Sequence, residues 1–230
     1  RGFTGRERAH AFLNLRIDQL HDPFLLLGMG DATDRILAAI AQGEAMAIHG
    51  DYDVDGITST VMLRRAIEVL GGQISHFVPD RHRDGYGLQP ATVERLHAQG
   101  ARLIVSVDCG IRATEAAERA RELGIDLIIT DHHEPDAVLP RALAVLNPKR
   151  SDCAYPEKHL AGVGVALKLV QGLMARAGRG PEFLPHFLKI AAIGTLADVV
   201  PLVGENRVIA HCGLAALSKG PHGAGLEALL

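Results

Sequence analysis

Short apolar segments alternate along the chain with longer amphipathic segments. Five apolar runs have the length of strands and lack the alternation of a half-exposed sheet, so we expect them to be covered on both faces. These runs are AMAIHG (45–50), QISHFVP (73–79), RLIVSVD (102–108), DLIIT (126–130) and ALAVLN (142–147). Helical patterns that end at glycines separate them, at Ile57–Leu70, Pro90–Gln99 and Thr114–Leu123. The alternation predicts an α/β fold with a parallel, doubly wound, five-stranded sheet flanked by helices.

Helical patterns also occur on both sides of this region. Residues 6–42 have the pattern of helices, and residues 160–230 are helical almost throughout. We therefore divide the chain into an N-terminal helical extension (1–44), an α/β domain (45–150) and a helical C-terminal part of the same domain (151–230). The first residue is not Met, and the last residues, GLEALL, stop within a helix-like pattern. We expect a fragment of a longer protein.

The composition says more about the cellular compartment of the protein than about its function. A net charge of -3 neither requires nor excludes a nucleic-acid partner, since a basic groove can lie within a near-neutral protein. The cysteines Cys109, Cys153 and Cys212 include no CxxC pair, which favours a reducing compartment without a disulfide framework. No apolar run reaches membrane-spanning length and no signal-peptide pattern is present, so we expect a cytoplasmic protein without a membrane partner.

Acidic and imidazole side chains follow three of the five predicted strands. HGDYDVDG (49–56) closes the first strand, DCG (108–110) the third and DHHE (131–134) the fourth. In such sheets the carboxyl ends of the strands meet at one edge, where ligands bind. Carboxylates packed this closely repel one another unless a cation neutralises them. Oxygen and imidazole donors together suit Mn, Mg, Zn or Fe, so the pattern predicts a metal site at this edge.

The first of these segments has its own internal pattern. Asp53 and Asp55 are two residues apart and would point the same way from extended backbone. Asp51 shares that direction, but it is closer to the strand and either caps the loop or orients a ligand. The helix expected from Ile57 would carry TST (58–60) in its first turn, where free N–H groups favour an anion such as phosphate.

Each feature also has a purely structural interpretation. An Asp at a strand-to-helix junction is commonly a helix cap, which is the favoured interpretation of Asp108 taken alone. A His-His pair is most often on the surface. Three such clusters on three separate strand ends, however, favour a metal site over a coincidence.

Four motifs identify a family resemblance. DYDVDG, VDCG, TDHHEP and GTLADVVPL occur in this order and resemble the motifs of the DHH phosphoesterase family. HGDYDVDGITST, PDRHRDGYGL, AGVGVALKL and GTLADVVPLVGENR are similar to its RecJ branch of single-strand-specific exonucleases, over residues 45–218. The nanoRNases and manganese-dependent pyrophosphatases of the same family resemble HxNPDxDA in the first motif, from which this chain departs. The resemblance implies a metal-dependent 5′–3′ exonuclease that releases 5′-mononucleotides from single-stranded DNA in repair and recombination.

The resemblance also implies two Mn²⁺ or Mg²⁺ ions that share Asp108. It assigns Asp55, Asp108, His132 and Asp198 to the first ion, and Asp53, Asp108 and His49 to the second. Asp198 is identified by its motif alone, because an Asp before Pro201 otherwise looks like a helix end.

Catalytic roles follow from the same resemblance. His133 matches the histidine that faces the substrate phosphate, and Asp131 orients the imidazoles. Asp53 and Asp55 complete the catalytic set. By resemblance the partners include a single-strand-binding protein and a helicase. A second lobe is expected outside this chain, so the fragment should bind metal but hold single strands weakly.

Substrate contacts are predicted with alternatives left open. Arg81 and Arg83 precede GYGL at the end of the second strand, where they either grip backbone phosphates or form a solvated basic loop. Tyr86 either stacks a base or packs the loop. Gly162 and Gly164 begin a helix, where glycine permits close approach to phosphate or close helix packing, and we favour packing.

Two other functions are less consistent with the sequence than the exonuclease. One is a nanoRNase-like DHH phosphoesterase acting on short oligonucleotides or nucleotides, against which PDRHRDGYGL argues. The other is a non-catalytic RecJ-like scaffold, which the complete set of motif carboxylates and histidines disfavours. A nucleotide-binding Rossmann module is excluded because no GxGxxG follows the first strand.

Overall fold

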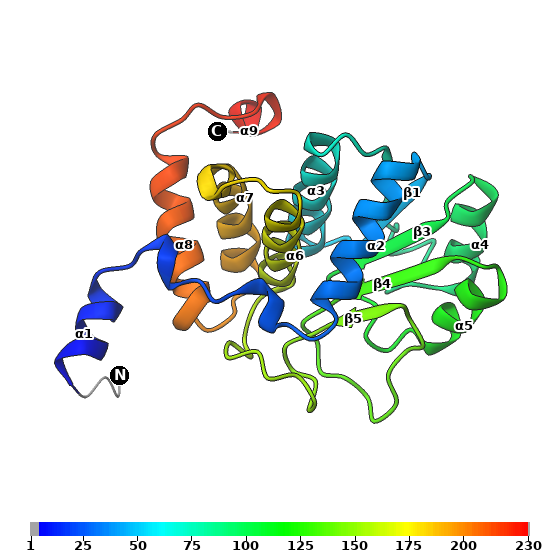
Figure 1. Cartoon of the computed structure of the whole chain (residues 1–230), viewed down its shortest axis with the longest axis horizontal. Helices are drawn as coiled ribbons and strands as arrows, with labels where there is room; N and C mark the ends of the chain where they lie inside the picture. Colours follow the sequence, from blue (N-terminus) through cyan, green and yellow to red (C-terminus); the bar gives the residue numbers. More distant parts are fainter. Residues whose placement is uncertain (1–4, 230) are drawn as a thin grey trace.

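The computed structural model describes residues 5–229, so the parts of the predictions that concern residues 1–4 and 230 lie outside the described residues (Figure 1). Its centre is one parallel sheet with the strand order β2-β1-β3-β4-β5. The strands are β1 (Met46–Gly50), β2 (Ile74–Phe77), β3 (Leu103–Val107), β4 (Asp126–Thr130) and β5 (Ala144–Leu146). The order reverses direction between β1 and β3, which opens a crevice at their carboxyl ends. The predicted doubly wound, five-stranded sheet is confirmed.

Helices from three parts of the chain cover one face of this sheet (Figure 1). They are α2 (Met29–Gln42), α3 (Val54–Val69) and α6 (Gly162–Arg176), with α7 (Leu184–Ala197) packed on α3 and α6. Met46 and Ile48 of β1 belong to the core on this face. The helix α2, from the predicted extension, is therefore part of the same packed layer.

The other face carries α4 (Pro90–Ala98) and α5 (Thr114–Glu122). Ala47 of β1 points into this second core, between the two residues that point into the first. Side chains alternate across a strand, and burial on both faces explains why the strands are continuously apolar.

The remaining helices lie beside the sheet layer. These are α1 (Arg6–Leu13), α8 (Gly204–Leu217) and α9 (Ala224–Leu229), with three short 3-10 turns, η1 (Ile17–Gln19), η2 (Pro23–Leu25) and η3 (Pro181–Phe183). No helix within residues 5–229 is long and apolar enough to cross a membrane.

A buried ion pair joins α8 to α6. Lys168 and Glu205 have side chains that are 0% and 1% exposed, and their charged groups are 2.5 Å apart. The Tyr155 hydroxyl donates to Glu205 at 2.6 Å, and the N–H of His21 donates to it at 2.9 Å. One network thus holds together three parts of the chain: helix α6, helix α8 and the segment that precedes α2.

Candidate metal centre at the carboxyl ends of the strands

The loop after β1 ends earlier than the sequence pattern indicates. Asp53 caps α3, because its carboxylate accepts the N–H of Gly56 at 2.9 Å, and the helix begins at Val54. Asp55 therefore occupies the first turn and is buried. The predicted first-turn position of residues 58–60 is wrong, and the two threonine hydroxyls of that segment donate to main-chain carbonyls inside α3.

Asp55 faces the N-terminus of α6. The N–H groups of Gly162 and Val163 donate to its two oxygens at 2.6 and 2.7 Å. Burial raises the pKa of Asp55 to about 7 against the opposing effect of these N–H groups, and the nearby carboxylate of Asp198 adds to the rise. The helix terminus therefore fixes both oxygens of this carboxylate.

The two glycines that begin α6 serve close packing. A Cβ at position 162 would collide with the carboxylate of Asp108, so only glycine lets α6 approach Asp55 and Asp108 together. A Cβ at position 164 would lie against the side chain of Leu160, at 3.1 Å. Both observations support the packing alternative for Gly162 and Gly164.

Asp108 lies at the centre of the site in an uncommon conformation. Its φ is 60°, in the left-handed region that Asp tolerates better than most side chains, and its N–H donates to the carbonyl of Thr130 at 2.9 Å. Burial raises its pKa to about 11, and the neighbouring carboxylates of Asp55 and Asp53 add to the effect. The turn after β3 thus holds a carboxyl group where it resists ionisation.

His132 lies between the carboxylates of separate elements. Its Nε2 is 3.2 Å from Asp108 and 3.9 Å from Asp55, and its Nδ1 is 3.8 Å from Asp198, the C-cap of α7. Burial lowers the pKa of His132 to about 4, and the neighbouring His133 lowers it further. The imidazole is therefore uncharged near neutral pH, as a metal ligand must be.

Three overlapping groups of side chains bring ligand atoms within 4.8 Å of one another. They are Asp55–His132–Asp198, Asp108–His132–His133 and Asp51–Asp53–Asp108. The tertiary structure therefore gathers nearly all the ligands predicted from the motifs, and Asp108 lies in two groups. Asp51, which the sequence left as a cap or an orienting residue, joins one of them.

His49 takes no part in these groups among the described residues. Its side chain is buried on β1, where the ring stacks on Phe77 with centroids 5.7 Å apart. Burial lowers its pKa to about 4. Its predicted role as a ligand remains a prediction.

The residues of this site fit a divalent cation. Asp108 Oδ1 and His132 Nε2 are buried and face each other at 3.2 Å, yet neither has a hydrogen-bond partner within residues 5–229. Buried polar atoms are normally paired. Several carboxyl groups with raised pKa values beside an uncharged imidazole form a donor set that a cation would stabilise in its ionised form.

Asp131 contacts His133 through both its main chain and its ring, which is compatible with the predicted orienting role. Its Oδ1 accepts the main-chain N–H groups of His132 and His133 and lies 2.7 Å from His133 Nδ1, while Oδ2 accepts the N–H of Ile111. Burial favours a higher pKa for Asp131, but the hydrogen bonds from His133 and Ile111 outweigh it and hold the pKa below its usual value. The hydrogen bond to Asp131 raises the pKa of His133.

We expect Asp131→Asn to lower the pKa of His133, because the neutral amide removes the negative charge that stabilises the imidazolium. An NMR pH titration of the His133 ring in chelator-treated protein measures this directly. Asp136→Asn is the matched control, since that exposed carboxylate contacts Arg112 instead. An unchanged pKa in Asp131→Asn would contradict the proposed coupling.

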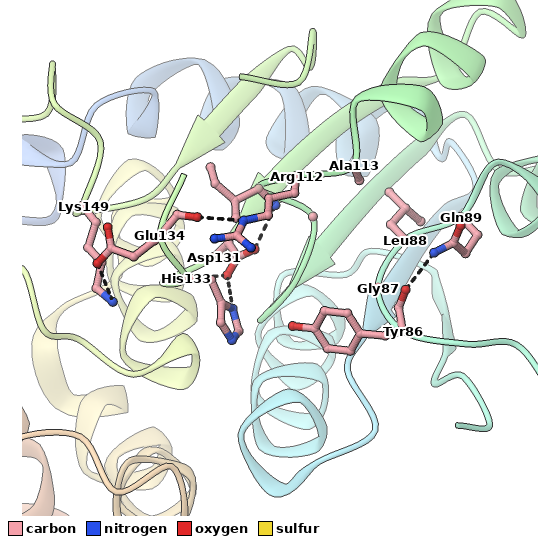
Figure 2. A pocket seen from close by; sticks show the side chains of 12 residues that line it. Tyr86, Gly87, Leu88, Gln89, Arg112, Ala113, Asp131, His133, Glu134 and Lys149 are labelled. Atoms are coloured by element: carbon pink, nitrogen blue, oxygen red, sulfur yellow. Dashed lines mark hydrogen bonds and ion pairs between the residues drawn. The ribbon is translucent and has the colours of Figure 1, made fainter. Parts of the chain in front are cut away.

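A cavity of about 570 Å³ opens beside this cluster (Figure 2). Its walls are residues 86–89, residues 110–113 and the side chains of Asp131, His133, Glu134 and Lys149. In Figure 2 the hydroxyl end of Tyr86 points towards the side on which His133 lies. Arg112 donates to the carbonyl of Glu134 at 3.1 Å, and Lys149 lies 3.4 Å from the Glu134 carboxylate. The cavity thus joins a half-exposed imidazole to two cationic side chains.

The predicted substrate contacts lie at different places relative to this cavity. Tyr86 lines it. The Arg81 guanidinium lies over the ring of Tyr52, 5.6 Å from its centroid, and Arg83 pairs with Asp80 at 3.2 Å. These positions leave both arginines on an exposed loop beside the site.

The sequence interpretation missed Arg112 and Lys149. Lys149 follows β5 by three residues, so the rule that functional side chains follow the strands would have found it. Arg112 lies two residues after the predicted DCG segment, and only the turn of the chain after Gly110 places it at the cavity. Asp51, beside Asp53 and Asp55 in the first motif, was considered from the sequence as a cap or an orienting residue but was not assigned as a metal ligand.

Comparison with known proteins gives consistent matches. The DHH family, N-terminal domain, matches residues 45–195. The single-stranded-DNA-specific exonuclease RecJ of Bacillus subtilis (strain 168) is 45% identical over 219 residues, which are 95% of this chain and 27% of that protein. RecJ of Escherichia coli (strain K12) is 41% identical over 215 residues, covering 89% of this chain and 37% of that protein.

A solved structure agrees with these relatives. A crystal structure of exonuclease RecJ bound to manganese superposes with a TM-score of 0.78 at 36% identity, over 87% of this chain and 49% of that one. The chain thus spans less than half of the length of each relative named here. The family match covers most of the chain and includes three of the four motifs in full, with the start of the fourth. The chain belongs to the DHH family.

Proposed function

We propose that this chain is the catalytic core of a divalent-cation-dependent exonuclease that hydrolyses single-stranded DNA and releases 5′-mononucleotides. The observation that carries the proposal is the cluster at the carboxyl ends of β1, β3 and β4, with Asp108 shared by two groups of ligand atoms. The likeness to proteins named single-stranded-DNA-specific exonucleases supports the substrate and the reaction. The 5′–3′ direction comes from the RecJ resemblance.

The proposed metal ligands fall into two sets that share Asp108. Asp55, His132 and Asp198 with Asp108 would hold one ion. Asp53 and Asp108 would hold the second, with His49 as a further predicted ligand, and we add Asp51 to this second set. When bound, Mn²⁺ or Mg²⁺ supplies Lewis-acid polarisation of the phosphoryl group and lowers the pKa of water. The relatives solved with Mn²⁺ and with Mg²⁺ support these two cations.

His133 stabilises negative charge on the reacting phosphate or donates a proton to the leaving group. Its Nδ1 is engaged by Asp131, so Nε2 is the ring nitrogen left to face the cavity. The raised pKa favours a protonated ring, which can donate to a phosphoryl oxygen or to the departing 3′ oxygen. Asp131 holds the ring in place for either of these donor roles, since it also accepts main-chain N–H groups of the same turn.

The cavity beside the cluster suits a nucleotide. Arg112 and Lys149 provide positive charge for phosphate, and Tyr86 provides a ring for a base. Arg81 and Arg83 on the adjacent loop extend this positive charge along a strand. Backbone-led binding of this kind is independent of sequence.

The proposal is tested by nucleotide release from 5′-labelled and 3′-labelled single-stranded oligonucleotides. We expect 5′-mononucleotides in Mn²⁺ or Mg²⁺ and none with chelator, and His132→Ala should lower the rate at least about 100-fold because it removes a metal ligand. His186→Ala, at an exposed position on α7, is the matched control and should retain the wild-type rate.

The substrate and the metal centre can fail separately in this assay. Hydrolysis confined to dinucleotides or nucleotide phosphates would leave the metal centre standing and replace the substrate with that of the nanoRNase-like alternative. Absence of any hydrolysis in a chain that binds Mn²⁺ would point either to a requirement for the second lobe or to the scaffold alternative, and the same assay on the full-length protein separates the two.

We further propose the domain organisation, the location and the partners of the whole protein. The chain corresponds to the catalytic part of a longer cytoplasmic enzyme, with an N-terminal extension (1–44), an α/β part (45–150) and a helical part (151–230) that carries the fourth motif. A second lobe supplies the grip on single strands, and a single-strand-binding protein and a helicase are the proposed partners in repair and recombination.

A further inference from the structure

A buried asparagine joins two backbone segments that carry or contact the proposed ligands. Asn206 is the third residue of α8, and its side chain is fully buried. Its amide Nδ2 donates to the carbonyl of His159 and to the carbonyl of Pro201, the latter at 3.2 Å. One side chain thus bridges the segment before α6 and the segment after α7.

The first of these segments contacts two of the proposed ligands. Three residues after His159, Gly162 packs so closely on Asp108 that a Cβ there would collide with its carboxylate. The N–H groups of Gly162 and Val163 then hold Asp55 at 2.6 and 2.7 Å. A shift of this segment would therefore disturb Asp55 and Asp108 together.

The second segment carries the third ligand of the same group. Asp198 is the C-cap of α7, and the next residue, Val199, has a φ of 60°. That left-handed conformation is strained for a β-branched side chain and persists only where its surroundings enforce it. Two residues later, the carbonyl of Pro201 accepts both Asn206 and the N–H of Val203. The hydrogen bond from Asn206 to Pro201 thus restrains the strained turn that carries Asp198.

The helix that carries Asn206 is itself fixed. Its neighbour Glu205 pairs with Lys168 of α6 at 2.5 Å. Both groups are buried, so α8 has little freedom to slide on α6. The Asn206 amide is therefore a rigid support for the two segments.

We propose that Asn206 is a positioning residue for the cation held by Asp55, His132 and Asp198. It contacts none of the three ligands and acts through the two carbonyls that it ties together. The inference rests on the metal centre of the proposed function. Supports of this kind behind metal ligands typically change metal affinity by about 10–100-fold when they are removed.

The test measures Mn²⁺ binding to the 230-residue chain. Isothermal titration calorimetry gives the affinities, and the electron paramagnetic resonance signal of free Mn²⁺ gives the amount bound. Asn206→Leu keeps the approximate volume and removes both donors. We expect one of the two ions to bind about 10-fold more weakly and to be restored by a higher Mn²⁺ concentration, with the second ion unchanged. Asn206→Ser, which keeps one donor, should fall between the wild type and Asn206→Leu.

Tyr155→Phe is the matched control. It removes a buried hydrogen bond from the same helix but touches neither His159 nor Pro201. It should lower the midpoint of thermal unfolding while leaving both Mn²⁺ affinities at the wild-type value.

The outcomes separate the positioning role from the proposed function. Wild-type affinity in Asn206→Leu, or an equal loss in Tyr155→Phe, would overturn the positioning role alone. A wild-type chain that binds no Mn²⁺ would overturn the metal centre and the positioning role with it. If Asn206→Leu does not fold, the Asn206→Ser affinity decides, and a value equal to the wild type overturns the role.

Discussion

Asp108→Asn should reduce DNA hydrolysis at least about 10³-fold, because about 4 kcal/mol of transition-state stabilisation by the cations corresponds to that factor. The expected loss is large because we propose that Asp108 is shared by both ions, and its carboxylate, like the imidazole of His132, lies in two of the three groups of ligand atoms. Mn²⁺ affinity should fall for both ions. Steady-state rates on a labelled oligonucleotide and a Mn²⁺ titration provide the two measurements.

The same substitution should leave the folded chain intact. Burial and the nearby carboxylates of Asp55 and Asp53 raise the pKa of Asp108 to about 11, so its ionised form is disfavoured without a cation. Near neutral pH the folded chain must keep this carboxyl protonated, at a cost that the unfolded chain does not have, and a neutral amide avoids that cost. Thermal unfolding in chelator should therefore occur at or above the wild-type temperature. Asp34→Asn, at an exposed position on α2, is the control for both measurements. A folded Asp108→Asn chain with wild-type hydrolysis would contradict the shared-ligand assignment.

Gly162→Ala should destabilise the chain by about 1–3 kcal/mol, the usual range for overpacking a well-packed site. The added Cβ needs the space that the Asp108 carboxylate occupies. Relief of that clash requires a shift of α6 or of the turn after β3, and either shift weakens the N–H contacts of Gly162 and Val163 with Asp55. Denaturant unfolding measures the stability, and a Mn²⁺ titration of the same protein measures the effect on the cluster.

Gly30→Ala is the matched control near the start of another helix. A Cβ there meets only the end of the Arg176 side chain, at 3.8 Å, so it should stabilise the chain by up to about 1 kcal/mol through helix propensity. Weakened DNA binding in Gly162→Ala, with stability and Mn²⁺ affinity unchanged, would instead support the alternative in which Gly162 approaches the substrate phosphate.

The strand pattern was sufficient to predict the sheet because burial on both faces leaves a simple signal. Each of the five apolar runs became a strand within a few residues of its expected bounds. The helix starts were harder to place, and α3 begins three residues before the predicted Ile57. The capping of α3 by Asp53 sets that boundary. A hydrogen bond from one polar side chain cannot be predicted from the spacing of apolar residues.

The residues of the candidate site were predictable to different degrees. Asp53, Asp55, Asp108 and the DHH turn follow strands directly, so the rule for ligand sites in parallel sheets locates them. Asp198 lies at the end of α7 and was identified only by its motif. It reaches His132 because α7 packs on α3 and α6, a contact between distant parts of the chain.

The sequence by itself determined the five-stranded α/β architecture, the edge at which the carboxylates meet and the chemistry of that edge. These features depend on local periodicity and on residue type, both of which can be read along the chain. The tertiary structure decided which of the predicted ligands lie close together, that Asp51 lies beside them and that Gly162 packs against Asp108. It also decided that Arg112 and Lys149 reach the cavity and that Asn206 ties two distant segments. These are distances between residues far apart in sequence, and they are set by how α6, α7 and α8 pack on the sheet layer.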